Sequence, residues 1–192
     1  MRFDDVTKRT LDMVCSCLGL LILALPLLLL MLIVRLTSPG PALYWSDRVG
    51  RHGVIFSMPK LRTMNLGTPE LPTHELPNAE AHITRLGRFL RRSSIDELPQ
   101  LYSVLKGDMS IVGPRPMIPA YKDILAQRRE AGVDVLRPGI TGWAQVNGRD
   151  DISTDAKLAL DVEYLQSKSV AHDLWIIYRT IIYVINRSGI SH

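Results

Sequence analysis

The feature that most constrains this chain is the apolar run MVCSCLGLLILALPLLLLMLIV, which extends from Met13 to Val34. It holds about 22 residues without a charge, and a helix needs roughly 20 apolar residues to cross a bilayer. A cleaved signal peptide would have a shorter apolar core followed by a small-residue cleavage site, whereas Arg35 and LTSPGP follow this run directly. We therefore expect a membrane segment that is kept in the mature protein.

Pro26 lies near the middle of this run, where a proline removes one backbone hydrogen bond and bends the helix. A straight transmembrane span that tolerates the proline is one interpretation. The flanks favour another, because Lys8 and Arg9 precede the run and Arg35 follows it, so the positive-inside rule gives no orientation for a crossing. We expect residues 1–36 to form a re-entrant membrane helix that is broken at Pro26 and returns to the same face.

The remaining residues, 37–192, predict one small catalytic domain, because the chain has 192 residues and no internal repeat. Apolar stretches around residues 43–45 and 54–56, separated by Gly50 and Gly53, predict a short β-hairpin. The proline-rich segment at about 65–80 has neither helical nor strand periodicity and predicts a mobile loop.

Helices are expected in the rest of this domain. Apolar residues recur at helical spacing from Ala81 onward, and a second helix is expected from Asp96 to Leu105. Residues 173–187, DLWIIYRTIIYVINR, combine a wide apolar stripe with aromatic and basic side chains. This pattern is typical either of a core helix or of an amphipathic helix in the bilayer surface. The expected fold class is α+β and mainly helical, with amphipathic interfacial helices after the membrane segment.

The charge of the chain favours anionic partners. The formal net charge is +4, which suits phosphates or lipid headgroups and does not choose between them. The only two cysteines, Cys15 and Cys17, lie inside the apolar run and are typical of small hydrophobic residues rather than of a disulfide or metal pair. A reducing compartment on the cytoplasmic side is consistent with this composition.

Asp96 and Glu97 are adjacent carboxylates and predict nearby positive charge, since like charges repel. One interpretation is structural: Ser94 and Glu97 have the spacing of a capping box at a helix start. The other is catalytic, with Asp96 as a carboxylate nucleophile and Glu97 as a ligand of a hard cation such as Mg²⁺. The two interpretations are compatible.

Phosphoryl chemistry also needs fixed positive charge, and arginine presents a rigid fork that matches phosphate geometry. Arg91 precedes the two carboxylates, and Arg115 follows them in a Pro-Arg-Pro sequence that restricts its backbone. Three glycines downstream, Gly139, Gly142 and Gly148, predict tight turns and close approach of the backbone to a ligand. The full set of candidate substrate-binding cations is Lys60, Arg62, Arg91, Arg115, Arg137 and Arg149.

Several blocks of the sequence together resemble the monotopic phosphoglycosyl transferases, the bacterial sugar transferase family. They are KRTLD, the apolar helix, RVGRHGVIFSMPKLRTM, RLGRFLRRSSIDELPQLYSVLKGDMSIVGPRP, LRPGITGWAQVNGR and LDVEYL. The resemblance extends from about Lys8 to Gly189 and is similar to the small members that consist of the catalytic core alone. One departure is Leu25, which stands before the proline where small members commonly have a serine.

This resemblance implies a phosphotransferase on the cytoplasmic face of a bacterial inner membrane. Such an enzyme moves a sugar 1-phosphate from a UDP-sugar to undecaprenyl phosphate, releases UMP and initiates lipid-linked glycan assembly, for example in exopolysaccharide synthesis. It also implies that Asp96 forms an aspartyl-phosphosugar intermediate, that Glu97 acts with Mg²⁺, and that Arg91 and Arg115 contact phosphate.

The expected partners are the UDP-sugar, undecaprenyl phosphate and membrane phospholipid, without nucleic acid, and a homodimer is left open. The identity of the sugar cannot be inferred from these motifs. A different class of function is a non-catalytic, membrane-anchored module that binds an anion through its arginines. The adjacent carboxylates weigh against it, because covalent phosphoryl transfer with a metal uses both signs of charge and a simple anion binder does not.

Overall fold

The computed structural model describes residues 3–69, 76–148 and 152–186. Its first element is α1 (Phe3–Thr37), which contains the apolar run. Within the described residues this is the one helix that is long and apolar enough to cross a membrane, with a mean hydropathy of 3.1. Only 6% of its most apolar window is buried against the rest of the protein. The apolar side chains of α1 therefore face outward, as expected for a helix surrounded by lipid.

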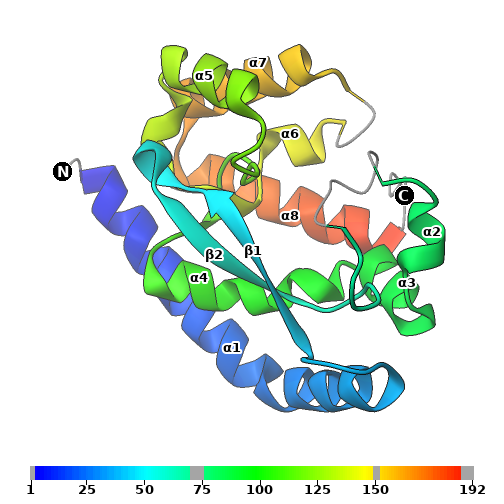
Figure 1. Cartoon of the computed structure of the whole chain (residues 1–192). Helices are drawn as coiled ribbons and strands as arrows, with labels where there is room; N and C mark the ends of the chain where they lie inside the picture. The colour runs from blue at the N-terminus through cyan, green and yellow to red at the C-terminus, as the bar shows by residue number, and fades with distance from the viewer. Residues whose placement is uncertain (1–2, 70–75, 149–151, 187–192) are drawn as a thin grey trace.

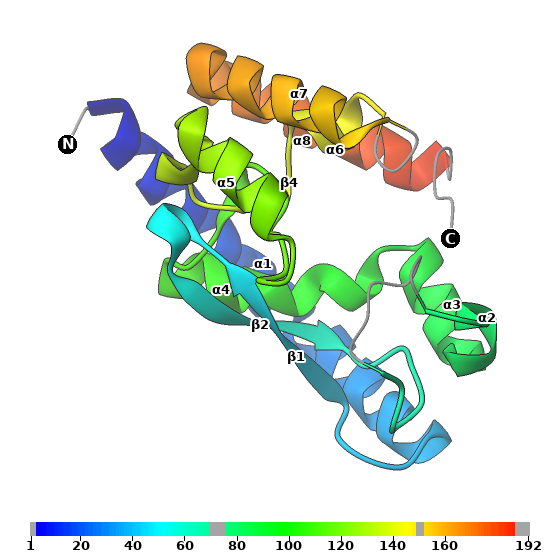
Figure 2. The same cartoon turned by 45° about the horizontal axis from the view of Figure 1, so that its top comes forward.

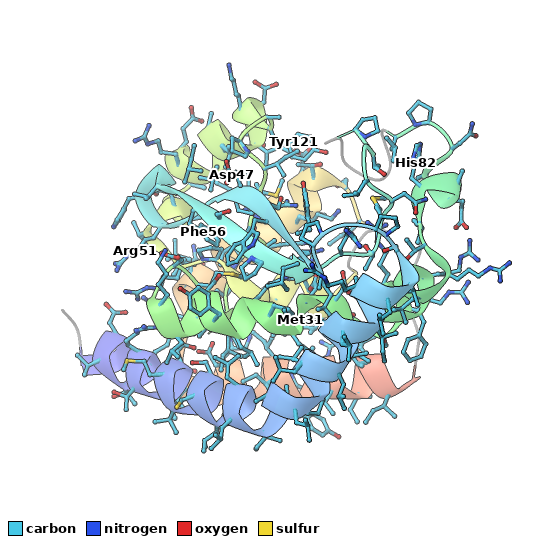
Figure 3. The ribbon with its side chains drawn as sticks, turned by 60° about the horizontal axis from the view of Figure 1, so that its bottom comes forward. Met31, Asp47, Arg51, Phe56, His82 and Tyr121 are labelled. Carbon is cyan, nitrogen blue, oxygen red and sulfur yellow. The ribbon has the colours of Figure 1, made fainter. Side chains whose placement is uncertain are left out.

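Pro26 lies inside α1, and the helix is continuous through it. Figures 1 and 3 show that the helix axis changes direction in its second half, and Met31 lies in the part beyond this change. The structure therefore shows a bent helix that ends at Thr37 rather than an interruption at Pro26.

The expected hairpin is confirmed as β1 (Leu43–Val49) and β2 (Ile55–Leu61), which pair antiparallel from Leu43↔Leu61 to Val49↔Ile55. A short 3-10 turn (Arg51–Gly53) joins them. A second sheet was not expected: β3 (Ser110–Val112) pairs parallel with β4 (Gly139–Thr141). Each of these strands has three residues, which is too short for an alternating pattern to identify it in the sequence.

The rest of the described chain is mainly helical, and this confirms the α+β class. Thr84 divides the first expected helix into two, because its side chain accepts a hydrogen bond from the Gly87 amide and begins a new helix. Part of the expected loop at 65–80 lies outside the described residues. Its last residues are helical. The helices are α2 (Ala79–His82), α3 (Arg85–Arg92), α4 (Leu101–Lys106), α5 (Lys122–Glu130), α6 (Trp143–Val146), α7 (Thr154–Ser167) and α8 (Val170–Asn186).

The C-terminal helix α8 uses its two faces differently. Ile176 is buried in a core cluster with Val112, Val146 and Tyr164. Most of the opposite apolar face is exposed, and its residues are Leu174, Trp175, Tyr178, Ile181, Ile182 and Ile185. Since α6 packs against both α7 and α8, these helices form a group on one side of the domain, with the β1–β2 hairpin on the other (Figure 2). The core interpretation therefore holds for one face of α8, and a position in the bilayer surface stays a prediction for the exposed face.

The N-terminal part of α1 is bonded to the catalytic domain through polar side chains. Buried Asp12 accepts hydrogen bonds from the Ser110 hydroxyl at 3.1 Å and from the Ile111 amide at 3.0 Å. Lys8 donates to the Val112 carbonyl at 3.0 Å and pairs with Asp173 of α8. Three consecutive residues of β3 are thus held by α1.

We predict that Asp12→Ala lowers the free energy of unfolding by about 1–3 kcal/mol, because the Ser110 hydroxyl and the Ile111 amide lose a buried acceptor. Unfolding of the wild type and of each variant would be followed by circular dichroism in the same detergent. The matched control is Asp47→Ala on β1, an exposed carboxylate whose loss should change the value by less than about 0.5 kcal/mol. Equal stability of the two variants would contradict the role given to Asp12.

Candidate active site

The two adjacent carboxylates lie on a 3-10 helix, Ile95–Gln100, which leads directly into α4. The capping-box prediction is wrong. Ser94 adopts a left-handed conformation with φ of 55°, and its side chain makes no capping hydrogen bond. The Glu97 amide donates instead to the Ser94 carbonyl at 3.2 Å. The α-helix that was expected from Asp96 therefore begins only at Leu101, after a tighter turn that contains Pro99.

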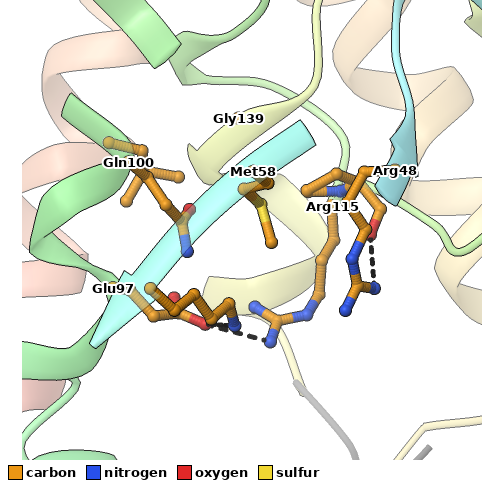
Figure 4. Close-up of a pocket in the computed structure, with 9 residues that line it drawn as sticks. Arg48, Met58, Glu97, Gln100, Arg115 and Gly139 are labelled. Carbon is orange, nitrogen blue, oxygen red and sulfur yellow. Dashed lines mark hydrogen bonds and ion pairs between the residues drawn. The ribbon is translucent and has the colours of Figure 1, made fainter. Parts of the chain in front are cut away.

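Of the two carboxylates, Glu97 is the one that forms ion pairs with basic side chains. Its Oε1 atom lies 2.7 Å from Lys60 Nζ and 3.4 Å from Arg115 Nη2, and Figure 4 shows these contacts. Burial alone would raise the pKa of Glu97, but the charges of Lys60 and Arg115 outweigh it and lower the pKa to about 2. Glu97 is therefore ionised at any physiological pH.

Asp96 has a different environment from that of its neighbour. Its side chain is 7% exposed, and no Lys or Arg of the described residues forms an ion pair with it. Burial and the negative charge of Glu97 raise the pKa of Asp96 to about 6, although Lys60 and Arg91 oppose the shift. The two adjacent carboxylates thus have pKa values that are pushed apart, as is typical of groups with different chemical roles.

A cleft lies over Glu97, and it joins segments that are distant in the sequence (Figure 4). Of the predicted residues, Lys60, Glu97 and Arg115 line it together, whereas Asp96 lies beside Glu97 and does not line it. Arg48, Lys60 and Arg115 carry three positive charges and Glu97 carries one negative charge. The cleft therefore has a net positive charge, which can bind a diphosphate. The lining residues are Arg48, Met58, Lys60, Glu97, Gln100, Arg115, Pro116, Gly139 and Ile140.

The other predicted cations lie elsewhere. The Arg91 Nε donates to Thr63 Oγ1 at 3.0 Å, close enough to Asp96 for their charges to interact. Arg62 is buried and donates to the carbonyl and hydroxyl of Ser38, just after α1.

Arg137 donates to the Gly107 carbonyl at 2.9 Å, and burial lowers its pKa. Neither Arg62 nor Arg137 lines the cleft. Arg149 lies outside the described residues. A role in substrate binding stays a prediction for all three.

Two polar residues of the cleft, Arg48 and Gln100, were not identified from the sequence. Arg48 donates to the Pro116 carbonyl at 3.4 Å, and burial, followed by the charge of Arg115, lowers its pKa. Gln100 ends the 3-10 helix and is buried. A spacing of three residues from Glu97 could have identified Gln100, but only if a 3-10 helix had been expected there.

The glycines around this site bring two parts of the backbone together. A Cβ on Gly139 would lie 2.1 Å from the Gly113 nitrogen, and a Cβ on Gly142 would lie 2.1 Å from the Gly113 oxygen. Close approach was expected toward a ligand, whereas the structure shows close approach between protein segments. This contact fixes the turn that carries Arg115, two residues after Gly113.

The described residues contain no group of three or more His, Cys, Asp or Glu side chains that could hold a metal without other ligands. Mg²⁺ is often held by one or two carboxylates together with water and substrate phosphates. Glu97 fits this arrangement, because it faces the cleft and only one of its two oxygens is bonded to Lys60 and Arg115.

This combination of an apolar N-terminal helix and a cationic, carboxylate-containing cleft defines a membrane-associated protein built for phosphate chemistry. The chain belongs to the bacterial sugar transferase family, whose pattern it matches over residues 3–187. The resemblance inferred from the motifs is therefore confirmed.

Similar proteins carry names that describe this chemistry. The chain is 42% identical to a UDP-glucose:undecaprenyl-phosphate glucose-1-phosphate transferase of Caulobacter vibrioides over 92% of this chain and 69% of that protein. It is 38% identical to an undecaprenyl-phosphate galactose phosphotransferase of Salmonella typhimurium over 98% of this chain, but it spans only 42% of that protein. The sugar transferase EpsL of Bacillus subtilis is 40% identical, with 97% of this chain and 91% of that protein covered.

Proposed function

We propose that this protein transfers a sugar 1-phosphate from a UDP-sugar to undecaprenyl phosphate. The observation that carries this proposal is the pair of adjacent carboxylates, one neutralised by Lys60 and Arg115 and the other buried without an ion pair. The names of two relatives, which refer to undecaprenyl phosphate and to glucose or galactose, support the substrate class.

The reaction proceeds in two displacements at one phosphorus. An oxygen of Asp96 bonds to the phosphorus that carries the sugar, the bond from this phosphorus to the bridging oxygen breaks, and UMP leaves with that oxygen. A phosphate oxygen of undecaprenyl phosphate then bonds to the same phosphorus and displaces the Asp96 carboxylate. The product is undecaprenyl diphosphate sugar, and the enzyme returns to its initial state.

Asp96 suits the nucleophile better than Glu97 does. Glu97 is engaged by two cations and has a pKa of about 2, so its electron pairs are strongly stabilised and weakly nucleophilic. Asp96 has a pKa of about 6, so it is mainly ionised at neutral pH and is a stronger nucleophile. Lys60 and Arg115 line the cleft, Arg91 lies close enough to Asp96 for their charges to interact, and these cations would stabilise phosphoryl oxygens during transfer.

Glu97 would hold Mg²⁺ together with the diphosphate, and such an ion would neutralise charge that develops on the leaving UMP. The carboxylate of Glu97 also orients Lys60 and Arg115 in the cleft. Two charged donors thus remain fixed in position when the diphosphate arrives, which lowers the entropy lost on binding.

The contacts of α1 support a re-entrant helix on the cytoplasmic face of the inner membrane. Near its start, Lys8 and Asp12 bind β3. Near its end, Val34 packs in a core cluster with Leu61 of β2 and Leu90 of α3. A straight crossing would place these two ends on opposite sides of the bilayer, although both contact the same domain. The exposed apolar face of α8 lies against phospholipid in this arrangement.

Asp96→Asn should abolish turnover while the protein stays folded, because the amide is not a nucleophile and has nearly the same shape. Without acceptor lipid, the wild type should become labelled by a UDP-sugar that carries radioactive phosphorus in its β-position. Asp96→Asn should not become labelled, and Glu97→Gln should become labelled slowly, on Asp96. Label retained by Asp96→Asn would identify another nucleophile.

Removal of divalent cations should stop the reaction, because the diphosphate charge would then lack a counter-ion in the cleft. UMP release would be measured in excess chelator and again after Mg²⁺ is added. Mg²⁺ alone should restore the rate, without a transition metal. Full activity in the chelator would remove Mg²⁺ from the scheme.

Cysteine labelling tests the membrane arrangement. Single cysteines would replace Asp4, at the start of α1, and Val54, which is 65% exposed in the hairpin turn, after Cys15 and Cys17 are changed to serine. In intact spheroplasts both sites should resist a membrane-impermeant thiol reagent, and both should react after lysis. Reaction at the Asp4 site before lysis would indicate a straight span.

A further inference from the structure

Gln100 is a largely buried residue whose side chain forms no hydrogen bond with another residue that the structure describes. It is 2% exposed and lines the cleft. Among the described residues its carboxamide makes no hydrogen bond, and it has no other interaction that would occupy it. Its carboxamide atoms are not among the fully buried polar atoms without a partner, so they are open to the cleft, where a bound group can accept a hydrogen bond from them.

The local helix explains why Gln100 faces the cleft. A 3-10 helix has about three residues per turn, so side chains three positions apart lie above one another. Glu97 and Gln100 have this spacing within the segment Ile95–Gln100. Figure 4 shows the Gln100 side chain extending into the cleft, toward the side where Glu97 and Arg115 lie.

We propose that Gln100 is a catalytic residue that donates a hydrogen bond from Nε2 to a non-bridging oxygen of the phosphoryl group under transfer. This inference rests on the proposed function and adds a contact to it. The charged groups beside Gln100, Lys60 and Arg115, are donors suited to phosphate oxygens. A neutral donor stabilises the transferring group without adding another positive charge to Arg48, Lys60 and Arg115.

The proposed contact of Gln100 is compatible with Asp96 as the nucleophile. Asp96 directly precedes Glu97, and Glu97 and Gln100 line the cleft together, so a phosphoryl group that is bonded to Asp96 and lies over Glu97 would be near the carboxamide of Gln100. The same donor then serves both displacements, because the phosphorus stays in place while UMP leaves and the lipid phosphate attacks. A fixed donor of this kind acts where charge develops, and its loss lowers kcat more than it raises KM.

The first test uses Gln100→Leu, which keeps the size of the side chain and removes the donor. UMP release would first be measured with a panel of UDP-sugars that includes UDP-glucose and UDP-galactose, and an active donor would be used for all variants. We expect kcat to fall about 100-fold while KM for the UDP-sugar changes less than about threefold. The matched control is Gln127→Leu on α5, which is exposed and should leave both constants unchanged.

The second test identifies the atom that Gln100 contacts. In UDP-sugars with sulfur in place of one non-bridging β-oxygen, the sulfur accepts hydrogen bonds weakly. For one of the two diastereomers, the wild type should slow by a larger factor than Gln100→Leu does. Equal factors for both proteins, with both diastereomers, would overturn the contact with the phosphoryl oxygen.

The outcomes separate this inference from the proposed function. Absence of UMP release by the wild type, with every UDP-sugar of the panel and undecaprenyl phosphate, would contradict the proposed function itself. An active wild type with an equally active Gln100→Leu would overturn the inference alone. A raised KM with unchanged kcat would also overturn it, because it would indicate ground-state binding.

Gln100→Glu guards against a folding defect. It keeps the shape of the side chain, removes a donor and places a carboxylate beside Glu97. If Gln100→Leu unfolds at a lower temperature than the wild type, Gln100→Glu decides, and it should also lose about 100-fold or more in kcat. Activity of a folded Gln100→Glu near that of the wild type would overturn the inference.

Discussion

The bond network between Asp12 of α1 and β3 is the interaction on which the rest of the structure depends. Asp12 and Lys8 hold Ser110, Ile111 and Val112. The next residues form the turn that carries Arg115 into the cleft. Because hydrogen bonds to a carboxylate are stronger than those between neutral groups, they join α1 firmly to the strand that leads into the turn with Arg115. The position of α1 in the bilayer thereby sets the position of the cleft.

The cleft solves a problem that two adjacent carboxylates create. Like charges next to each other would raise both pKa values if no cation were near. Lys60 and Arg115 act on Glu97 alone at ion-pair distance, so only Asp96 keeps the raised value. Glu97 is thereby a permanent anion that orients Lys60 and Arg115, whereas Asp96 has the properties required of the proposed nucleophile. The difference comes from the tertiary structure and not from the residue types.

The sequence predicted those features that depend on local pattern, namely the apolar helix, the hairpin, and the clustering of Lys60, Glu97 and Arg115. It failed where geometry depended on partners distant in the chain. The β3–β4 pair joins segments about 30 residues apart, and nothing local marks it. Ser94 has the right residue type for a cap, but its left-handed backbone prevents it. The contact of Arg62 with Ser38 likewise joins distant segments and has no local signal.

The proposed reaction takes one substrate from water and another from a membrane. The structure has a cationic cleft and, outside it, the exposed apolar faces of two helices. The cations of the cleft lie between the hairpin, the 3-10 helix and the turn after β3, where a water-soluble diphosphate binds well. The apolar faces of α1 and α8 lie outside this cleft and are exposed. The proposed covalent intermediate on Asp96 would suit such a division, because UMP could leave before the lipid phosphate arrives. The two substrates then use the same phosphate-binding groups in succession.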